Sequence, residues 1–483
     1  MKQRVLTVCA LSVLAAGCAG FPHRREPVQL SGPAPLDSLP VQGGASWPAA
    51  EWWKRYQDPT LNQLIEMAIA ASPTLATAHA RFESAEQSVR LAAATSGAHV
   101  TANGDVDRQR LSDNGFIPPH LLGFTWYNQA DLGLQATYTF DWWGKQRFAV
   151  EAAMDNAHAA QADRSAALLV LASSVADTYF GWQADQNRLN LAREKESTVQ
   201  QEGKIAAARV RAELESDEDL HRADLALATL REQIASLQGS AGLRLVALAA
   251  LLGKAQSELP SLQSKALPVY AGALPDDVKL DLISRRADIT ASRWRVEAAE
   301  KNLASARAEF FPDISVNLLL GVSSVDVGKL LEYGSRVPMA GAAIHLPIFD
   351  AGRLQAQYGG ARAAIDSAVS TYQDSVISAA REVATQATSL AQIEAQRQQR
   401  DIAVDAAQRI EESAAARVRQ GLTDSRTELT ATESWIDQRD AMLQLDSAAL
   451  SADIALQRAL GGGYDAAQKL AGPSSVNATM AAP

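Results

Sequence analysis

Cysteine is almost absent from this chain of 483 residues, which has only Cys9 and Cys18. Both lie close to the N-terminus, so the rest of the sequence offers neither a disulfide framework nor a thiolate set for zinc. The seven histidines are scattered, and no pair has metal-ligand spacing such as HExxH. We therefore expect no metal and no cofactor.

Catalytic motifs are missing too. The sequence has neither a phosphate-cradling glycine loop nor a nucleophile-elbow serine. Its many carboxylates stand on predicted helix faces beside arginine and lysine, where a solvated surface role is far more common than catalysis. The chain is therefore not expected to be an enzyme.

The chain has fewer basic than acidic residues, 45 against 55, and few aromatic ones. The net charge is −10, and no basic stripe indicates a nucleic-acid partner. Aromatic residues make up 6% of the chain, whereas alanine-rich helical patterns dominate. This composition favours elongated helical packing over a single thick core.

Glycine and proline are absent from Ala361–Gln420, so nothing in that stretch interrupts a helix. Apolar residues recur there at seven-residue steps, as Val369, Val376, Val383 and Leu390. This heptad predicts a long helix in a left-handed supercoil, of roughly 90 Å. A solitary coiled-coil stalk is the alternative.

The N-terminal residues indicate export and lipid attachment. A basic start precedes an apolar run that is too short for a permanent membrane helix. Leu14–Cys18 resembles a bacterial lipobox, which implies cleavage before Cys18 and acylation of that cysteine. We predict a signal peptide at 1–17 and a lipidated tether at 18–50. Plain secretion, with cleavage at a nearby small residue, is the alternative.

Apolar and polar residues alternate in two stretches of the first half, Val100–Asp107 and Ala130–Trp142. The alternation predicts strands with one apolar and one polar face. The second is long enough for a tilted strand that crosses a membrane. The aromatic cluster at its end resembles an interfacial girdle; its members are Tyr138, Phe140, Trp142 and Trp143.

The same order of features occurs twice. Ala208–Arg211 corresponds to Ala416–Arg419, and strand patterns recur at Ile314–Val322 and Ala340–Ile348. We therefore predict an internal duplication of a helix, two strands and a long helical hairpin. The predicted divisions are a first repeat at 51–253, an equatorial connector at 254–275, a second repeat at 276–461 and a C-terminal tail at 462–483.

Four strands cannot close a barrel alone, since closed spanning barrels have about eight or more. An open edge in lipid would leave backbone groups unpaired, at a cost of several kcal/mol each. The strands must therefore be completed by other subunits, or they lie outside a membrane. The polar face would line a lumen, with Thr101, Asn103, Gln135 and Thr137 on it.

Several short motifs stand in a characteristic order. They are Trp52–Trp53, Asp58–Leu61, Tyr138–Gly144, Leu251–Gly253, Leu282–Ile289, Phe310–Ile314, Pro347–Arg353 and Gly421–Asp424. With them the chain resembles the TolC-like outer-membrane efflux proteins, lipoprotein (NodT-type) branch, over nearly its whole length after Trp52. The resemblance implies an α+β membrane protein with coiled-coil-like helical hairpins and four transmembrane strands per protomer. It also implies a trimeric 12-stranded β-barrel continuous with a periplasmic α-barrel.

The resemblance implies the function as well. Such a protein is the exit duct of a tripartite efflux pump and passively conducts drugs or small organic compounds across the outer membrane. The implied partners are two further copies of the chain in a homotrimer, a periplasmic adaptor (membrane fusion) protein, an RND-type inner-membrane transporter and outer-membrane lipid. The implied location is the outer membrane, with a lipid anchor and a periplasmic extension.

In this family the hairpin tips meet the adaptor. The tips carry Glu213 and Leu214 in the first hairpin and Gly421 and Leu422 in the second. The second tip keeps the family's Gly-Leu pair, whereas Glu213 replaces the usual glycine of the first. A plain helix–turn–helix joint is the alternative.

The family also has a periplasmic constriction, with acidic residues six and nine positions after the second-tip glycine. Here those positions hold Thr427 and Thr430. Spacings of three and four residues place Asp424, Thr427 and Glu428 on one helix face, so we expect this trio to form the constriction. Ordinary polar surface is the alternative.

Ion pairs are expected between the tips, from Arg417 or Arg419 to an acidic first tip. The acidic residues there are Glu215, Asp217 and Asp219. Exposed pairs contribute at most about 1 kcal/mol each, but symmetry would repeat them.

Two other functions remain open. One is a lipid-anchored periplasmic spacer without a conduit, which would not need amphipathic strands of matched length. The other is a general solute porin, which the long helices disfavour.

Overall fold

The computed structural model describes residues 46–114, 118–268, 274–275 and 285–465. These residues form two compact units. The sheet unit contains 82–159 and 292–372, and the hairpin unit contains the other described residues. Cys18 and the predicted signal peptide lie outside the described residues, as does most of the predicted tether.

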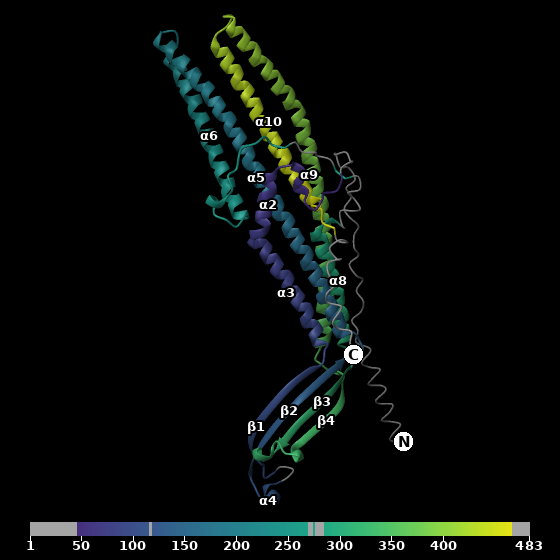
Figure 1. The fold of residues 1–483 in the computed structure, drawn as a ribbon. Helices are drawn as coiled ribbons and strands as arrows, with labels where there is room; N and C mark the ends of the chain where they lie inside the picture. The colour runs from purple at the N-terminus through teal and green to yellow at the C-terminus, as the bar shows by residue number, and fades with distance from the viewer. Residues whose placement is uncertain (1–45, 115–117, 269–273, 276–284, 466–483) are drawn as a thin grey trace. The chain divides into compact units, whose positions relative to one another are not determined.

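An antiparallel four-stranded sheet forms the centre of the sheet unit, as far as the described residues extend, with the strands in chain order (Figure 1). Its strands are β1 (His99–Arg110), β2 (Trp126–Phe140), β3 (Asp313–Ser324) and β4 (Arg336–His345). Ala130 is opposite Ser324, and Asp313 is opposite His345. Each predicted repeat therefore supplies two neighbouring strands.

The last strand differs from its prediction, since it covers Arg336–His345 rather than Ala340–Ile348. The chain leaves the sheet before Pro347, which has no backbone N–H to donate to a strand ladder. The sequence period alone did not indicate this end, because apolar residues continue to alternate up to Ile348.

The strands lead into two long helices through the same capping arrangement. Asp141 accepts hydrogen bonds from the backbone N–H groups of Gln146 and Arg147, at 3.1 and 2.7 Å, at the start of α5 (Lys145–Arg211). Asp350 accepts one at 2.8 Å from Leu354 at the start of α9 (Arg353–Arg419). A carboxylate at a helix N-terminus satisfies free donors and complements the helix dipole.

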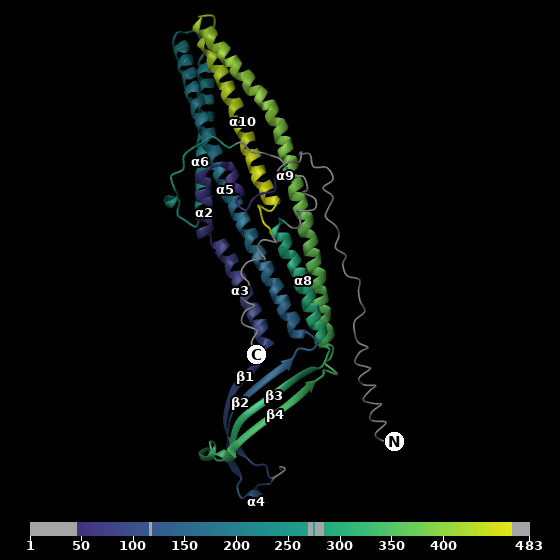
Figure 2. The same ribbon diagram turned by 45° about the vertical axis from the view of Figure 1, so that its right-hand side comes forward.

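Two helical hairpins make up much of the hairpin unit. The first joins α5 to α6 (Asp217–Leu251), and the second joins α9 to α10 (Ser425–Ala459). Helices α5 and α9 both have 67 residues, and α6 and α10 both have 35. Figures 1 and 2 show the hairpins side by side, and an ion pair of 2.8 Å from Arg188 to Asp440 joins α5 to α10.

Shorter elements complete the fold. They are η2 (Trp52–Tyr56), α2 (Pro59–Ala71), α3 (Pro73–Thr95), α4 (Pro119–Leu122), η3 (Gln256–Glu258), α8 (Ala287–Ala308), η4 (Val327–Lys329) and η5 (Tyr333–Ser335).

The main core lies where η2 and α2 pack on the roots of the hairpins. It includes Leu64, Tyr179 and Leu248, which are fully buried. The hydroxyl of Tyr56 donates a 2.7 Å hydrogen bond to Asp453 on α10, and burial raises the pKa of this hydroxyl above its usual value. The N-terminal helices are therefore fixed to the hairpins by both apolar and polar contacts.

The heptad predicted on α9 is buried along its length, since Val369, Val376, Val383 and Leu390 are all at most 7% exposed. On the other hairpin, α6 packs on α5 through Leu230, Ile234 and Leu237. Among the helices of the described residues, α6 is the one long and apolar enough to cross a membrane by length and composition. Its packing on α5 covers only part of this apolar stretch, of which 28% is buried, while Leu225 and Leu243 are 68% and 73% exposed.

Candidate functional sites in the sheet and at the hairpin tips

One face of the sheet is polar. Register places Thr101 opposite Gln135, and Thr137 opposite Asn317. The Thr137 hydroxyl donates a 3.0 Å hydrogen bond to the Asn317 side chain. This face carries the residues predicted to line a lumen, and it suits contact with water.

The other face is apolar. Leu132, Leu134 and Leu320 lie on it and are 49%, 53% and 68% exposed in the single chain. Aromatic residues gather where the strands meet the helices: the Trp143 ring stacks on Phe311 at 4.6 Å, and its indole N–H donates to the Pro312 carbonyl. Leucines bordered by aromatic rings are typical of a surface that faces lipid.

Both edges of the sheet are open. Within the described residues β1 pairs only with β2, and β4 pairs only with β3. Unpaired backbone donors and acceptors therefore run along the outer sides of β1 and β4, which are available to a strand from another copy.

The hairpin tips share one backbone motif. Glu213 and Gly421 both have positive φ, 61° and 72°. The N–H of Leu214 donates to the Arg209 carbonyl, and that of Leu422 donates to the Arg417 carbonyl, both at 2.9 Å. These bonds define a Schellman motif at each tip, so Glu213 adopts the conformation that glycine would have.

The turns leave Leu214 and Leu422 exposed, at 68% and 69%. Two apolar side chains at the ends of long helices form a surface on which a partner could pack. The four residues predicted to contact the adaptor thus lie at the two turns.

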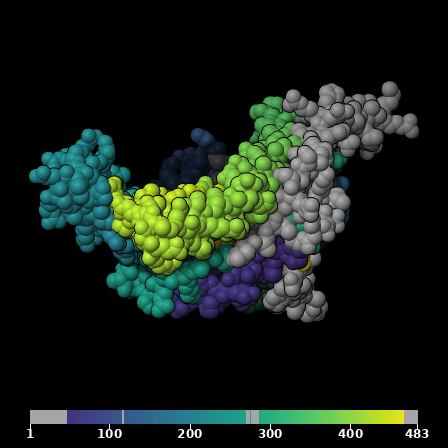
Figure 3. Space-filling model, turned by 90° about the horizontal axis from the view of Figure 1, so that it is seen from above, coloured from purple at the N-terminus to yellow at the C-terminus, as the bar shows by residue number. Residues whose placement is uncertain are grey.

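The tips are joined by a chain of ion pairs that differs from the predicted one. Glu215, whose side chain is only 12% exposed, pairs with Arg209 at 2.8 Å and with Arg426 at 2.5 Å. Arg209 also pairs with Asp424 at 3.1 Å. In Figure 3 the second hairpin, in yellow to green, adjoins the teal first hairpin at this end. Arg209 and Arg426 therefore bind the two hairpins together.

Within one described chain, Arg417 and Arg419 make no ion pair, and both are exposed. Arg417 donates instead to the carbonyl of Ser413, at 3.4 Å. The physical reason is how the two hairpins pack: α5 of the first hairpin lies against α10 of the second, so Arg209 on α5 reaches Asp424 in the second tip. Arg209 occupies in the first repeat the position that Arg417 occupies in the second. The correspondence of the two repeats was therefore the sequence signal that could have pointed to Arg209.

The other two acidic residues of the first tip, Asp217 and Asp219, make no contact with the second hairpin among the described ion pairs. Asp219 accepts from the Ser216 hydroxyl and pairs with Arg222 at 3.0 Å on the same helix. Asp217 is exposed in the first turn of α6.

The residues predicted for the constriction have several local partners. Asp424 is the N-cap of α10, and the N–H of Arg426, with the charge of Arg209 contributing, holds the pKa of Asp424 below its usual value. The hydroxyls of Thr423 and Thr427 lie 3.1 Å apart, and the Thr430 hydroxyl donates to the Arg426 carbonyl at 2.9 Å. Glu428 is partly buried in the first turn of α10.

Glu433 on α10 and Glu202 on α5 form a pair of carboxyl groups that the sequence did not indicate. Burial, together with the charge of Glu202 on α5, raises the pKa of Glu433 on α10 to about 7. The Thr430 hydroxyl is 3.3 Å from a Glu202 oxygen, and Lys195 pairs with Asp437 at 2.7 Å. Charge on this helix contact therefore changes near neutral pH.

Known proteins resemble this chain over most of its length. The family model described as outer membrane efflux protein matches residues 64–254 and 280–462, one segment in each repeat. The multidrug resistance outer membrane protein MdtP of Escherichia coli (strain K12) is 33% identical over 482 residues, which cover 95% of this chain and 97% of that protein. MdtQ of Escherichia coli O6:H1 is 30% identical over 469 residues, covering 94% and 97%.

Solved structures agree in fold. The outer membrane protein VceC of Vibrio cholerae has a TM-score of 0.78 and 32% identity, over 87% of this chain and 100% of that one. The outer-membrane channel OprN has a TM-score of 0.81 and 26% identity, over 92% and 98%. These matches confirm the predicted outer-membrane channel fold with its internal duplication. The chain belongs to the outer membrane efflux protein family.

Proposed function

We propose that the chain is the outer-membrane exit duct of a tripartite efflux pump and passively conducts drugs or small organic compounds. The observation that carries this proposal is the sheet, which has an apolar face, a polar face and two open edges. Such a sheet is incomplete in lipid until other copies pair with its edges.

Three copies are the number we propose. Two copies would supply eight strands, and the interior of an eight-stranded barrel is filled by side chains. Three copies would supply twelve strands around a lumen wide enough for water, lined by residues such as Thr137 and Asn317. The relatives' names support drugs as the exported compounds.

The hairpin tips are the proposed contact with a periplasmic adaptor, which would connect the duct to an RND-type inner-membrane transporter. Exposed Leu214 and Leu422 support this assignment. Glu213 and Gly421 would give both turns the shape that presents these leucines. Acylated Cys18 would add a lipid anchor at the periplasmic side of the membrane.

We still propose that the constriction is lined by Asp424, Thr427, Glu428 and Thr430. The ion pairs among Arg209, Glu215 and Arg426 would hold the two tips together and so keep the constriction narrow. Arg417 and Arg419 would face the first tip of the next protomer, where Asp217 is exposed. The proposal includes no catalysis, because compounds would pass through the duct passively.

The test combines assembly, conductance and export. Detergent-extracted full-length protein is expected to have a trimer mass by light scattering and to conduct ions in planar bilayers. A strain that lacks it is expected to become more susceptible to drugs. A monomer without conductance would contradict the proposal and favour the periplasmic spacer, whereas conductance without any change in susceptibility would favour the porin.

A further inference from the structure

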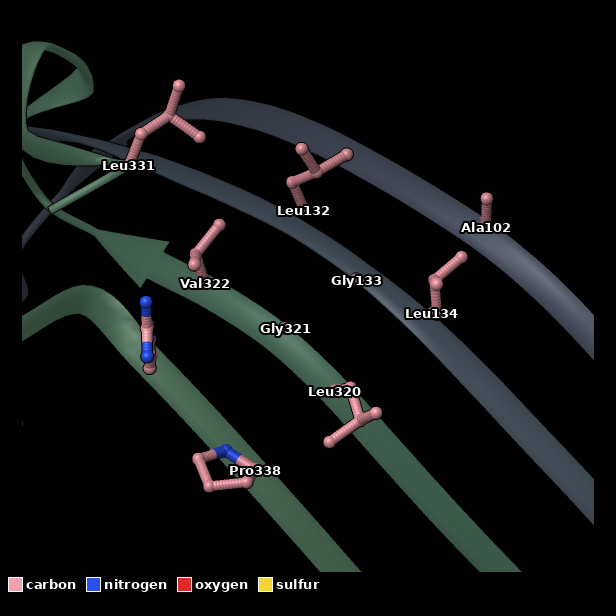
Figure 4. A pocket seen from close by; sticks show the side chains of 10 residues that line it. Ala102, Leu132, Gly133, Leu134, Leu320, Gly321, Val322, Leu331 and Pro338 are labelled. Carbon is pink, nitrogen blue, oxygen red and sulfur yellow. The ribbon is translucent and has the colours of Figure 1, made fainter. Parts of the chain in front are cut away.

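A shallow groove crosses the apolar face of the sheet (Figure 4). Its volume is about 540 Å³, and all four strands line it. Strand register divides most of its lining into two rows. One row is Leu132, Val322 and Arg336, and the other is Ala102, Leu134, Leu320 and Pro338.

The floor between the rows is the backbone at Gly133 and Gly321, which are opposite each other on β2 and β3. A Cβ on Gly321 would lie 3.0 Å from the Leu132 carbonyl oxygen, so the close approach of these strands leaves little room for a larger residue. Rows two residues apart on a strand are separated by about 7 Å. The groove therefore has the width and the apolar walls that suit one extended hydrocarbon chain.

One end of the groove is basic. Arg336 ends the first row at the start of β4, and its guanidinium lies 4.3 Å from the Tyr333 ring centroid. The side chain is exposed, and no carboxylate of the described residues is within ion-pair distance of it. Arg108, on the same face of β1, lies over Trp126 at 5.7 Å.

An arginine on a lipid-facing surface is costly unless an anion or water compensates its charge. A phosphate suits this role, because guanidinium binds its oxygens through two parallel hydrogen bonds. Apolar walls that end at an arginine therefore match a molecule with a hydrocarbon chain and an anionic head. A free phosphate would use the arginine but not the walls.

We propose that this groove binds a phosphate-bearing membrane lipid, with an acyl chain between the two rows and the phosphate at Arg336. The inference rests on the proposed function only in placing the sheet in the outer membrane. Arg336 lies at the loop end of the sheet, opposite the ends that lead into α5 and α9. The lipid would thus belong to the leaflet on the loop side.

The test is native mass spectrometry of the full-length protein in a neutral detergent. The probes are phosphatidylglycerol, diacylglycerol with the same acyl chains but no phosphate, and glycerol phosphate. We expect phosphatidylglycerol to bind about tenfold more tightly than diacylglycerol, as one charge-assisted contact to the phosphate would give. Glycerol phosphate is expected not to bind.

Three variants locate the site. Arg336→Gln should remove the preference for phosphatidylglycerol, and Ala102→Phe should weaken both lipids by filling the groove. Arg409→Gln, a control at an arginine of α9 that is 80% exposed, should change neither. Arg336→Lys keeps the charge and should retain part of the preference.

Equal binding of the two lipids by the unaltered protein, or a preference that survives Arg336→Gln, would overturn the inference. Planar-bilayer conductance of each variant reports assembly and separates this outcome from failure of the proposed function. If the unaltered protein conducts but shows no lipid preference, the site is wrong and the duct stands. If the unaltered protein does not conduct, the duct itself is contradicted.

Discussion

Glu213 in the first hairpin tip has the same backbone conformation as Gly421 in the second, with φ of 61° and 72°. Glycine adopts this left-handed conformation without steric cost, whereas a residue with a Cβ is strained in it. Because the hydrogen bonds of the two turns match, the hairpin imposes the turn at Glu213 and the side chain does not favour it.

Replacing Glu213 with glycine should therefore stabilise the first tip by about 1 kcal/mol. Hydrogen exchange of the last turn of α5 is the measurement, and slower exchange is the expected result. Gly421→Ala is the matched control and should accelerate exchange at the end of α9. Faster exchange in Glu213→Gly would mean that the glutamate side chain stabilises the turn.

Arg209→Ala should loosen the contact between the hairpins, because it removes the pairs to Glu215 and Asp424. A loss of about 1 kcal/mol would raise the ratio of open to closed tips about fivefold. The expected readout is a higher mean conductance in planar bilayers. Arg222→Ala is the control, since its pairs stay within α6. Equal conductance in both variants would show that Arg209 does not hold the tips closed.

Conductance should also depend on pH through Glu433, whose pKa is raised to about 7 from 4.5. The folded chain binds this proton more tightly than the unfolded chain, so the contact loses stability as pH rises from about 4.5 to 7. Above pH 7 Glu433 is charged, and the neighbouring Glu202 disfavours this charge. We expect conductance to increase with pH, with a midpoint near 7.

Glu433→Gln removes the titrating group and should flatten this pH profile, whereas Glu86→Gln, at an exposed residue of α3, should leave it unchanged. A profile in Glu433→Gln identical to that of the unaltered protein would assign the pH dependence to another group.

Divalent cations should block the duct through Asp424 and Glu428, if these carboxylates line the constriction in every protomer. The double variant Asp424→Ala and Glu428→Ala is expected to need about tenfold more cation for half block. Thr427→Ala is the uncharged control. Unchanged block in the double variant would place the constriction elsewhere on the helices.

Acylation of Cys18 is the last prediction. Mass spectrometry of the mature protein should find a lipid-modified N-terminal cysteine. Cys18→Ala should abolish the modification without preventing assembly, because the sheet edges rather than the lipid drive strand pairing. An unmodified N-terminus at another residue would favour plain secretion.

The sequence by itself determined the duplicated architecture and the elements that carry it. These predictions succeeded because they depend on local patterns. The heptad of α9 and the alternation of β2 each indicate which face of a single element is apolar. Strands too few to close alone indicated that other subunits complete the sheet or that it lies outside a membrane, and the resemblance to the efflux family implied the outer membrane.

Only the tertiary structure decided which charges meet and where the lipid-facing groove lies. Glu215 pairs with Arg209 and Arg426, because α5 of the first hairpin lies against α10 of the second. The raised pKa of Glu433 depends on Glu202 from the other hairpin, and the groove depends on the register that puts Gly133 opposite Gly321. Contacts between residues far apart in sequence leave no periodic signal, because each depends on how whole elements pack.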